Sequence, residues 1–272
     1  MHDILVHVRD FEQHTPAARF GMQLAASRGA SVTGVYTYLQ PGYVAPAFEP
    51  ELMMDVVEVT RELARDASQA RQPFMDWAAS LGVRQCSWLV AKGSTGDALA
   101  QAATRHDLLV LDHADDQLGL AWDIPEIILN TGAPCIVVPH GGAEYKPFER
   151  IAIGWNGSPE AMRAVHAALP FLQGKQALLL CGEERGPYHG VEWDPPFHMM
   201  DYLRNHDVAA ERCEVTGAGD GAGAALLEQA AAFGAELLVM GAYGRSRFSE
   251  WMLGGATRHA LTAADIPVLL RH

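Results

Sequence analysis

Four glycines with a regular spacing are the residues best placed to do chemistry in this chain. They follow an apolar run that ends at Met240, and they are Gly241, Gly244, Gly254 and Gly255. Glycine lets the backbone approach a ligand closely or adopt a positive φ. Ala256 and Thr257 then open a helix-like run, and the free N–H groups at a helix start favour phosphate. The pattern predicts a phosphate cradle, but glycines that only turn the chain from a strand into a helix would give the same spacing.

The charge of the chain favours a small anionic ligand over a large anionic partner. The 272 residues carry a formal net charge of −13, which argues against binding nucleic acid or an anionic membrane surface. A small anionic ligand needs a locally positive site. The glycine-rich stretch supplies one through its basic side chains, Arg245, Arg247, Arg258 and His259.

The strands and helices that must position this stretch occur once in each half of the chain. Each half opens on an apolar strand, at 3–8 and at 150–155, and continues with a hydroxyl residue and a proline, Thr15-Pro16 and Ser158-Pro159. That pair predicts a capped helix start with proline in the first turn. The repeat predicts domains at 1–140 and 148–272, with the Gly-containing, charged segment 141–150 as the linker between the repeats.

Strands alternate with helices in both halves, which predicts an α/β fold. The runs LLVLD, CIVVP and LLVM are apolar throughout, as strands buried on both faces of a parallel sheet must be. Such sheets bind ligands beyond the carboxyl ends of their strands, at a switch point in the strand order. The glycine-rich stretch begins at such an end.

These features resemble the universal stress protein family. The pattern G-x2-G-x9-G-[G/S/T] lies between the predicted fourth strand and the last helix of the second half, at 241–255. The resemblance implies two tandem domains, each a five-stranded parallel sheet flanked by helices, Rossmann-like and adenine nucleotide alpha hydrolase-like. It also implies binding of ATP, with or without Mg²⁺, and no strong catalytic reaction.

The resemblance further implies a role for each matching residue of the second half. Asn156, preceded by Trp155, takes a position usually held by an Asp that contacts the nucleoside, and Cys181 lies where backbone groups meet adenine. Gly255 stands where the family often has Ser, so one hydroxyl is lost. The other implied site residues are Met240, Gly241, Tyr243, Gly244, Gly254, Ala256 and Thr257, with Gly244 and Gly254 at the phosphates.

The first half serves as an internal control, because most of its counterparts of the cradle residues are charged or bulky. Such side chains would repel a polyphosphate or fill its space, so we expect no ATP site there. The first half is expected to make the same turn without these glycines. The need to turn the chain therefore does not by itself explain the glycines of the second half. The replacements are Arg9 for Asn156, Asp112 for Gly241, Asp115 for Gly244, Ala121 for Gly254, Trp122 for Gly255 and Asp123 for Ala256.

Other patterns carry less weight. GxGxxA at 217–222 resembles a dinucleotide fingerprint but follows the third strand of its half, not the first. The segment 189–198 holds zinc-ligand residue types without a standard zinc spacing. No GxxxxGK[ST] or GxSxG motif is present, and neither His166 nor His259 has an evident catalytic partner. We therefore predict no metal ligand and no catalytic residue.

The compartment is predicted to be the cytoplasm. The four cysteines are scattered without a CxxC pair, which is typical of core thiols in a reducing compartment. No apolar run approaches the roughly 18 residues of a membrane span, and MHDILVHV at the start lacks the pattern of a signal peptide.

The sequence thus predicts an ATP-binding, stress-response regulatory protein that binds adenine nucleotide in its second half. Two alternatives stay open, a weak ATP-hydrolysing enzyme of a related fold and a ligand-free interaction scaffold. The family resemblance also implies that the halves associate through the strands CIVVP and PVLLR as a pseudo-dimer within one chain. Two chains would then pair into a homodimer.

Overall fold

A computed structural model describes the chain except for residues 40–49, 114–123, 183–193, 195–197, 217–219 and 243–254. Contacts between Cα atoms divide it into two units. The first unit comprises Met1–Ala133 and Gly142–Lys146, and the second comprises Pro134–Gly141 and Pro147–His272.

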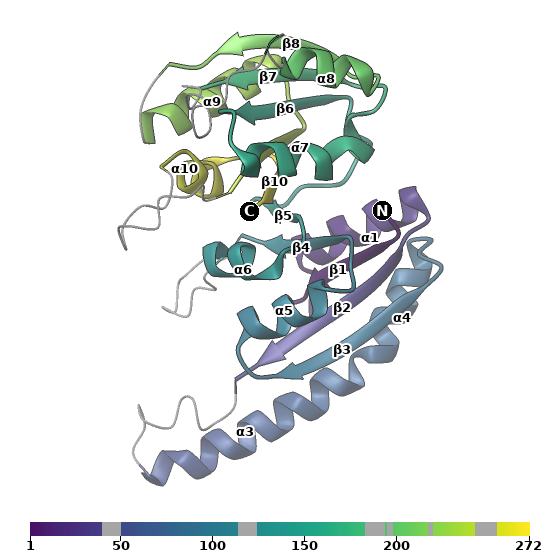
Figure 1. The fold of residues 1–272 in the computed structure, drawn as a ribbon. Helices are drawn as coiled ribbons and strands as arrows, with labels where there is room; N and C mark the ends of the chain where they lie inside the picture. Colours follow the sequence, from purple (N-terminus) through teal and green to yellow (C-terminus); the bar gives the residue numbers. More distant parts are fainter. Residues whose placement is uncertain (40–49, 114–123, 183–193, 195–197, 217–219, 243–254) are drawn as a thin grey trace. The chain divides into compact units, whose positions relative to one another are not determined.

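The described part of the first unit contains four strands and five helices (Figure 1). The strands are parallel and lie in the order β3-β2-β1-β4. In chain order the elements are β1 (Asp3–His7), α1 (Pro16–Arg28), β2 (Ser31–Tyr38), α3 (Pro50–Gln69), α4 (Arg71–Ser80), β3 (Cys86–Lys92), α5 (Thr95–Ala103), β4 (Leu108–Asp112) and α6 (Ile124–Thr131).

Helices cover both faces of the sheet in the first unit. Val6 of β1 and Gly34 of β2 are paired in register and point to the same face. A Cβ on Gly21 of α1 would meet Val6, and a Cβ on Gly34 would meet Phe74 of α4, so α1 and α4 share that face. Helix α5 contacts β1 and β2 and packs against α6. Strand β4 is buried along its whole length, which explains its uninterrupted apolar sequence.

The described part of the second unit contains six strands and four helices. Strand order is β5-β10-β9-β6-β7-β8, with β5 antiparallel to β10 and every other pair parallel. The elements are β5 (Cys135–Val138), β6 (Arg150–Trp155), α7 (Pro159–Leu172), β7 (Gln176–Cys181), α8 (Met199–Asn205), β8 (Ala209–Glu214), α9 (Asp220–Phe233), β9 (Leu237–Gly241), α10 (Gly255–Ala263) and β10 (Val268–Arg271).

The predicted α/β fold is confirmed, and so are both predicted helix starts. Thr15 Oγ1 accepts a hydrogen bond from Ala18 N at 3.4 Å, and Ser158 Oγ accepts one from Ala161 N at 3.1 Å. Each helix has proline directly after its cap. These side-chain oxygens satisfy N–H groups that have no partner inside the helix.

The segment between the repeats is held in place by its aromatic residues. Tyr145 is buried against Phe20, with ring centroids 5.4 Å apart, and its N–H donates to Gln23 Oε1 at 2.9 Å. Phe148 is buried against Phe171 of α7. The strand CIVV, predicted as the last of the first half, groups by its contacts with the second unit because it pairs with β10.

The prediction of core thiols holds for two of the four cysteines. Cys135 and Cys181 are buried, whereas Cys86 and Cys213 are half-buried on the edge strands β3 and β8. Burial raises the pKa of the Cys86 thiol to about 11, which keeps it protonated and poorly nucleophilic at neutral pH.

Candidate functional site

The strand order of the second unit has its switch point between β6 and β9. The connection from β6 leads outward to β7, whereas β9 lies on the other side of β6 and leads to β10. Ligands of open α/β sheets bind beyond the carboxyl ends of the strands at such a point. The predicted residues Trp155, Asn156, Met240 and Gly241 lie at these two strand ends, and Cys181 ends β7 beside them.

Asn156 links the end of β6 to the start of α7. Its Oδ1 accepts a hydrogen bond from Ser158 N at 3.1 Å, a local turn typical of Asn before a helix. The side chain is half-exposed, and its amide nitrogen has no acceptor among the described residues. The oxygen of Asn156 therefore shapes the turn, while its amide N–H groups stay unused among the described residues.

The backbone carbonyl groups at the ends of β6 and β7 already accept hydrogen bonds from the chain. The carbonyl of Trp155 accepts from Gly182 N at 2.9 Å, and the carbonyl of Cys181 accepts from Val215 N at 2.7 Å. Trp155 is half-buried, while the Cys181 side chain is buried. Any ligand contact by Cys181 must therefore come from its backbone, as the family resemblance implies.

Gly241 has a packing role that the sequence did not reveal. A Cβ at this position would lie 2.5 Å from Ala161 N and 2.6 Å from the carbonyl carbon of Glu160. Real Cβ atoms do not approach backbone this closely, so the first turn of α7 sits against β9 only because residue 241 is glycine. Met240, on the opposite face, is buried beside Gly154.

Helix α10 begins with three of the predicted cradle residues. Gly255 and Ala256 are half-exposed and Thr257 is buried. A Cβ on Gly223 of α9 would lie 3.1 Å from Ala256 Cα and 2.6 Å from His259 Cβ. Gly223 therefore allows α9 and α10 to cross closely, which fixes the start of α10.

Several predicted residues lie outside the described part of the chain. They include Tyr243, Gly244 and Gly254 of the glycine motif and the basic residues Arg245 and Arg247. The first two glycines of the GxGxxA pattern and most of the segment 189–198 are also outside it. Their roles remain predictions.

Two charged residues near the same strand ends were not predicted. Glu160, in the first turn of α7, is 3% exposed, and its Oε2 has no hydrogen-bond partner within the described chain. Its Oε1 lies 3.6 Å from Arg163. Arg271 ends β10 opposite Gly241, and its Nε is buried, again without a partner among described residues. A charged residue that ends an apolar strand is the sequence signal that would have found Arg271.

The first unit has a different arrangement at its own switch point, between β1 and β4. The strand registers show which residues correspond between the two units. Ile4 pairs with Leu108 in the first unit, and Ile151 pairs with Leu237 at the matching place in the second. Asp112 thus occupies the position of Gly241, as the sequence comparison predicted.

Asp112 binds the helix start of its own unit. Its Oδ1 accepts from Ala17 N of α1 at 2.6 Å, and its Oδ2 lies 3.6 Å from Arg9 Nε. Burial raises the pKa of the Asp112 carboxyl above its ordinary value, while the Ala17 N–H and Arg9 act in the opposite direction. In this unit the chain itself supplies the anion at the helix N-terminus.

His7 lies beside this pair, at the end of β1. Complete burial, with a contribution from Arg9, lowers the pKa of His7 from 6.5 to about 3. Its counterpart in the second unit is Gly154. The strand ends at the first switch point therefore carry His7, Arg9 and Asp112. The matching positions of the second unit are Gly154, Asn156 and Gly241, and its charged groups, Glu160 and Arg271, come from neighbouring elements.

The described residues do not assemble a catalytic constellation. Ser158 is the cap of α7, and the His166 ring packs against Tyr202 of α8, with centroids 5.6 Å apart. The described part of the chain also holds no group of three or more His, Cys, Asp or Glu side chains that could bind a metal ion. Its helices include none that is both long and apolar enough to cross a membrane.

Comparison with known families gives one match. Residues 191–272 match the model of the universal stress protein family, which confirms for this part the resemblance seen in the sequence. The matched segment includes the glycine motif and α10. No curated protein matches the chain in sequence.

Solved structures share the fold over nearly the whole chain. A universal stress protein from Archaeoglobus fulgidus DSM 4304 is 12% identical, with a TM-score of 0.65, and the alignment covers 99% of this chain and 97% of that protein. A protein of unknown function from Pseudomonas aeruginosa PAO1 is 12% identical, with a TM-score of 0.55 and coverage of 99% and 92%. At these identities the likeness establishes the fold, a mostly parallel α/β sheet flanked by helices.

Proposed function

We propose that the chain is a regulatory protein that binds one adenine nucleotide, ATP, in its second unit. The ligand would lie beyond the carboxyl ends of β6 and β9. Its nucleoside would meet Asn156 and the backbone at Gly241, and its phosphates would meet the glycine motif and the start of α10. The match of 191–272 to the universal stress protein family supports this choice of ligand.

The observation that carries the proposal is the difference between the two switch points. In the first unit the Asp112 carboxylate already accepts from one N–H group of α1, that of Ala17. In the second unit Gly241 replaces that carboxylate, and α10 starts at the same edge of the sheet with three small residues. Free N–H groups at the end of a helix of this length attract phosphate. Arg271 adds positive charge at the neighbouring strand end.

Binding without efficient chemistry fits the rest of the unit. The described residues offer no nucleophile held by a base, so any ATP hydrolysis would be slow. We propose that nucleotide occupancy is the signal that the protein reads in a stress response. The antiparallel pairing of β5 with β10 supports the further proposal that the chain forms an internal pseudo-dimer.

The test is ATP-induced thermal stabilisation in a matched pair of variants. Gly254→Asp places a carboxylate among the groups proposed to bind phosphate, so stabilisation by ATP should be lost. At ATP about 100-fold above Kd, wild type should gain about 2.7 kcal/mol. Gly96→Asp adds the same charge in the first unit, where a Cβ meets no atom within 4 Å, and should keep the full shift.

Two results would count against nucleotide binding. Equal stabilisation of Gly254→Asp and Gly96→Asp would remove the phosphate assignment. Wild-type protein that shows no shift at millimolar ATP would favour the alternative of a ligand-free interaction scaffold.

A further inference from the structure

Two basic residues at the end of β10 have no counterpart in the first half of the chain. Strand β10 ends in Arg271, and His272 follows it. Both β5 and β10 come directly after a proline. Counting from that proline, Arg271 and His272 correspond to Val138 and Pro139. The two basic side chains therefore belong to the unit proposed to bind nucleotide, at the carboxyl ends of its strands.

His272 lies on the face of the sheet that carries α9 and α10. A Cβ on Gly154 would lie 3.4 Å from Met240 Cβ and 3.1 Å from Leu226 of α9, so Met240 points toward α9. Leu270 pairs with Met240 in register, and the side chain of His272, two residues further, points to the same face. Helix α10 packs against α9, and the right-handed crossover from β9 to β10 places it on this face.

The start of α10 lies at the same end of the strands as His272. Helix α10 has nine residues and β10 has four, and each rises about 13 Å. Because the helix runs antiparallel to the strand that follows it, its first turn is level with the end of β10. The N–H groups of Gly255 and Ala256 are in that turn, where the proposed function places phosphate.

The imidazole ring of His272 is held through one of its two nitrogens. Nδ1 lies 3.1 Å from the carbonyl oxygen of Ala242, the residue after β9. A carbonyl oxygen only accepts, so Nδ1 carries a hydrogen in this bond. Nε2 has no bond among the described residues, and the side chain is half-exposed. The ring is therefore fixed at the end of β9, with one nitrogen unused by the described chain.

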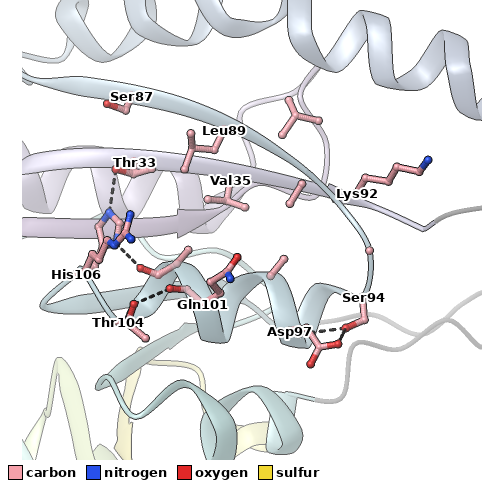
Figure 2. Close-up of a pocket in the computed structure, with 16 residues that line it drawn as sticks. Thr33, Val35, Ser87, Leu89, Lys92, Ser94, Asp97, Gln101, Thr104 and His106 are labelled. Carbon is pink, nitrogen blue, oxygen red and sulfur yellow. Dashed lines mark hydrogen bonds between the residues drawn. The ribbon is translucent and has the colours of Figure 1, made fainter.

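His106 of the first unit shows the contrasting case (Figure 2). It lines an open groove of about 900 Å³ between β2, β3 and α5. Its Nε2 bonds Thr33 Oγ1 at 2.9 Å, and its Nδ1 bonds the Ala102 carbonyl at 2.8 Å. Both ring nitrogens of His106 are used inside the fold, whereas His272 uses only one.

We propose that His272 binds a phosphate group of the nucleotide in the second unit, an inference that rests on the proposed function. Its Nδ1 stays on the Ala242 carbonyl, and Nε2 of the protonated ring donates a hydrogen bond to a phosphate oxygen. A bond between an imidazolium and a phosphate is charge-assisted and stronger than a neutral one. Because Nδ1 keeps its hydrogen, Nε2 donates only after the ring takes up a proton from solvent.

The charges around His272 favour an anionic ligand. Helices α7 and α10 and strands β5 and β9 lie beside β10. The titratable groups at this end of these elements and of β10 itself are Glu160, Arg163, Arg258, His259, Cys135 and Arg271. The carboxylate among them, Glu160, lies with Gly241 on the opposite face of the sheet. Phosphate is therefore the anion that the protonated ring meets on the α10 face.

The test is the ATP affinity of two substitutions at His272, measured by calorimetric titration at about pH 6.5. His272→Asn keeps a donor near the place of Nδ1 but removes Nε2, so the ATP affinity should fall at least about tenfold. His272→Gln carries its amide near the place of Nε2 and should retain more of the affinity. His106→Gln, in the first unit, should bind ATP as wild type does.

Two further readouts separate phosphate binding from a structural role. Adenosine has no phosphate, so wild type and His272→Asn should bind it equally. The ratio of the wild-type ATP affinity to that of His272→Asn should rise at least about fivefold from about pH 8 to about pH 6, because imidazole gains its charge in this range. The ratio cancels the protonation of ATP itself.

Equal ATP affinity of wild type and His272→Asn would overturn the inference. An equal loss of ATP and adenosine binding would also overturn it, because His272 would then only support the end of β9. Both results leave ATP binding by the second unit intact. Wild-type protein that binds no ATP would instead overturn the proposed function together with this inference.

Discussion

The two units share four parallel strands in matching order, and at one matched position they differ in how the start of a helix is held. Asp112 in the first unit accepts from the Ala17 N–H group. Gly241, at the matching place in the second unit, leaves no side chain there and lets the backbone of α7 approach β9. A single residue type thus decides how the helix start is held, by a side-chain carboxylate in the first unit and by direct backbone packing in the second.

The largest effect that tests this comparison is expected from Gly241→Ala. The added Cβ would lie 2.5 Å from Ala161 N, and because that atom is backbone, α7 would have to move. Overpacking of this kind costs about 3 kcal/mol. Gly182→Ala is the matched control at a neighbouring strand end, since its Cβ has no neighbour closer than 3.8 Å. For this control, the free energy of unfolding measured by urea denaturation should change by less than about 0.5 kcal/mol.

Equal stability of the two alanine variants would contradict the packing role of Gly241. It would also remove the reason for treating glycine at 241 and aspartate at 112 as alternative solutions to the same contact.

A smaller, pH-dependent effect is expected from His7 in the first unit. The folded state keeps His7 neutral down to about pH 3, whereas the unfolded chain binds a proton below about pH 6.5. Below that pH the unfolded state binds more protons, so the free energy of unfolding falls by about 1.4 kcal/mol per pH unit as the pH decreases. This loss continues until about pH 3, where the folded protein also protonates.

His7→Leu should remove that part of the acid sensitivity. Urea unfolding between about pH 7 and pH 5 should show a shallower decline for the variant, with carboxyl groups contributing alike to both proteins. Parallel curves for wild type and variant would show that His7 is not held neutral by its burial.

Local sequence signals predicted the features that depend on neighbouring residues. The capped starts at Thr15 and Ser158 follow from a hydroxyl residue before proline. The equivalence of Asp112 and Gly241 follows from two apolar strands of equal length. These features could be read because each depends on a few consecutive residues.

Contacts between distant segments could not be predicted in this way. The bond from Ala17 N to Asp112 joins residues that are 95 positions apart, and the fit of Gly241 against Ala161 depends on how closely α7 packs. The two helices α3 and α4, which lie between β2 and β3, are a further feature that the repeat of strands and helices did not reveal.

The most direct test of the central claim is the number of ATP molecules bound per chain, measured by native mass spectrometry and by calorimetric titration. One ATP should bind wild type, and Asp112→Asn in the first unit should change neither that number nor the affinity by more than about twofold. Two ATP molecules per chain would mean that the first switch point also binds nucleotide. Absence of binding would contradict the assignment of the second unit.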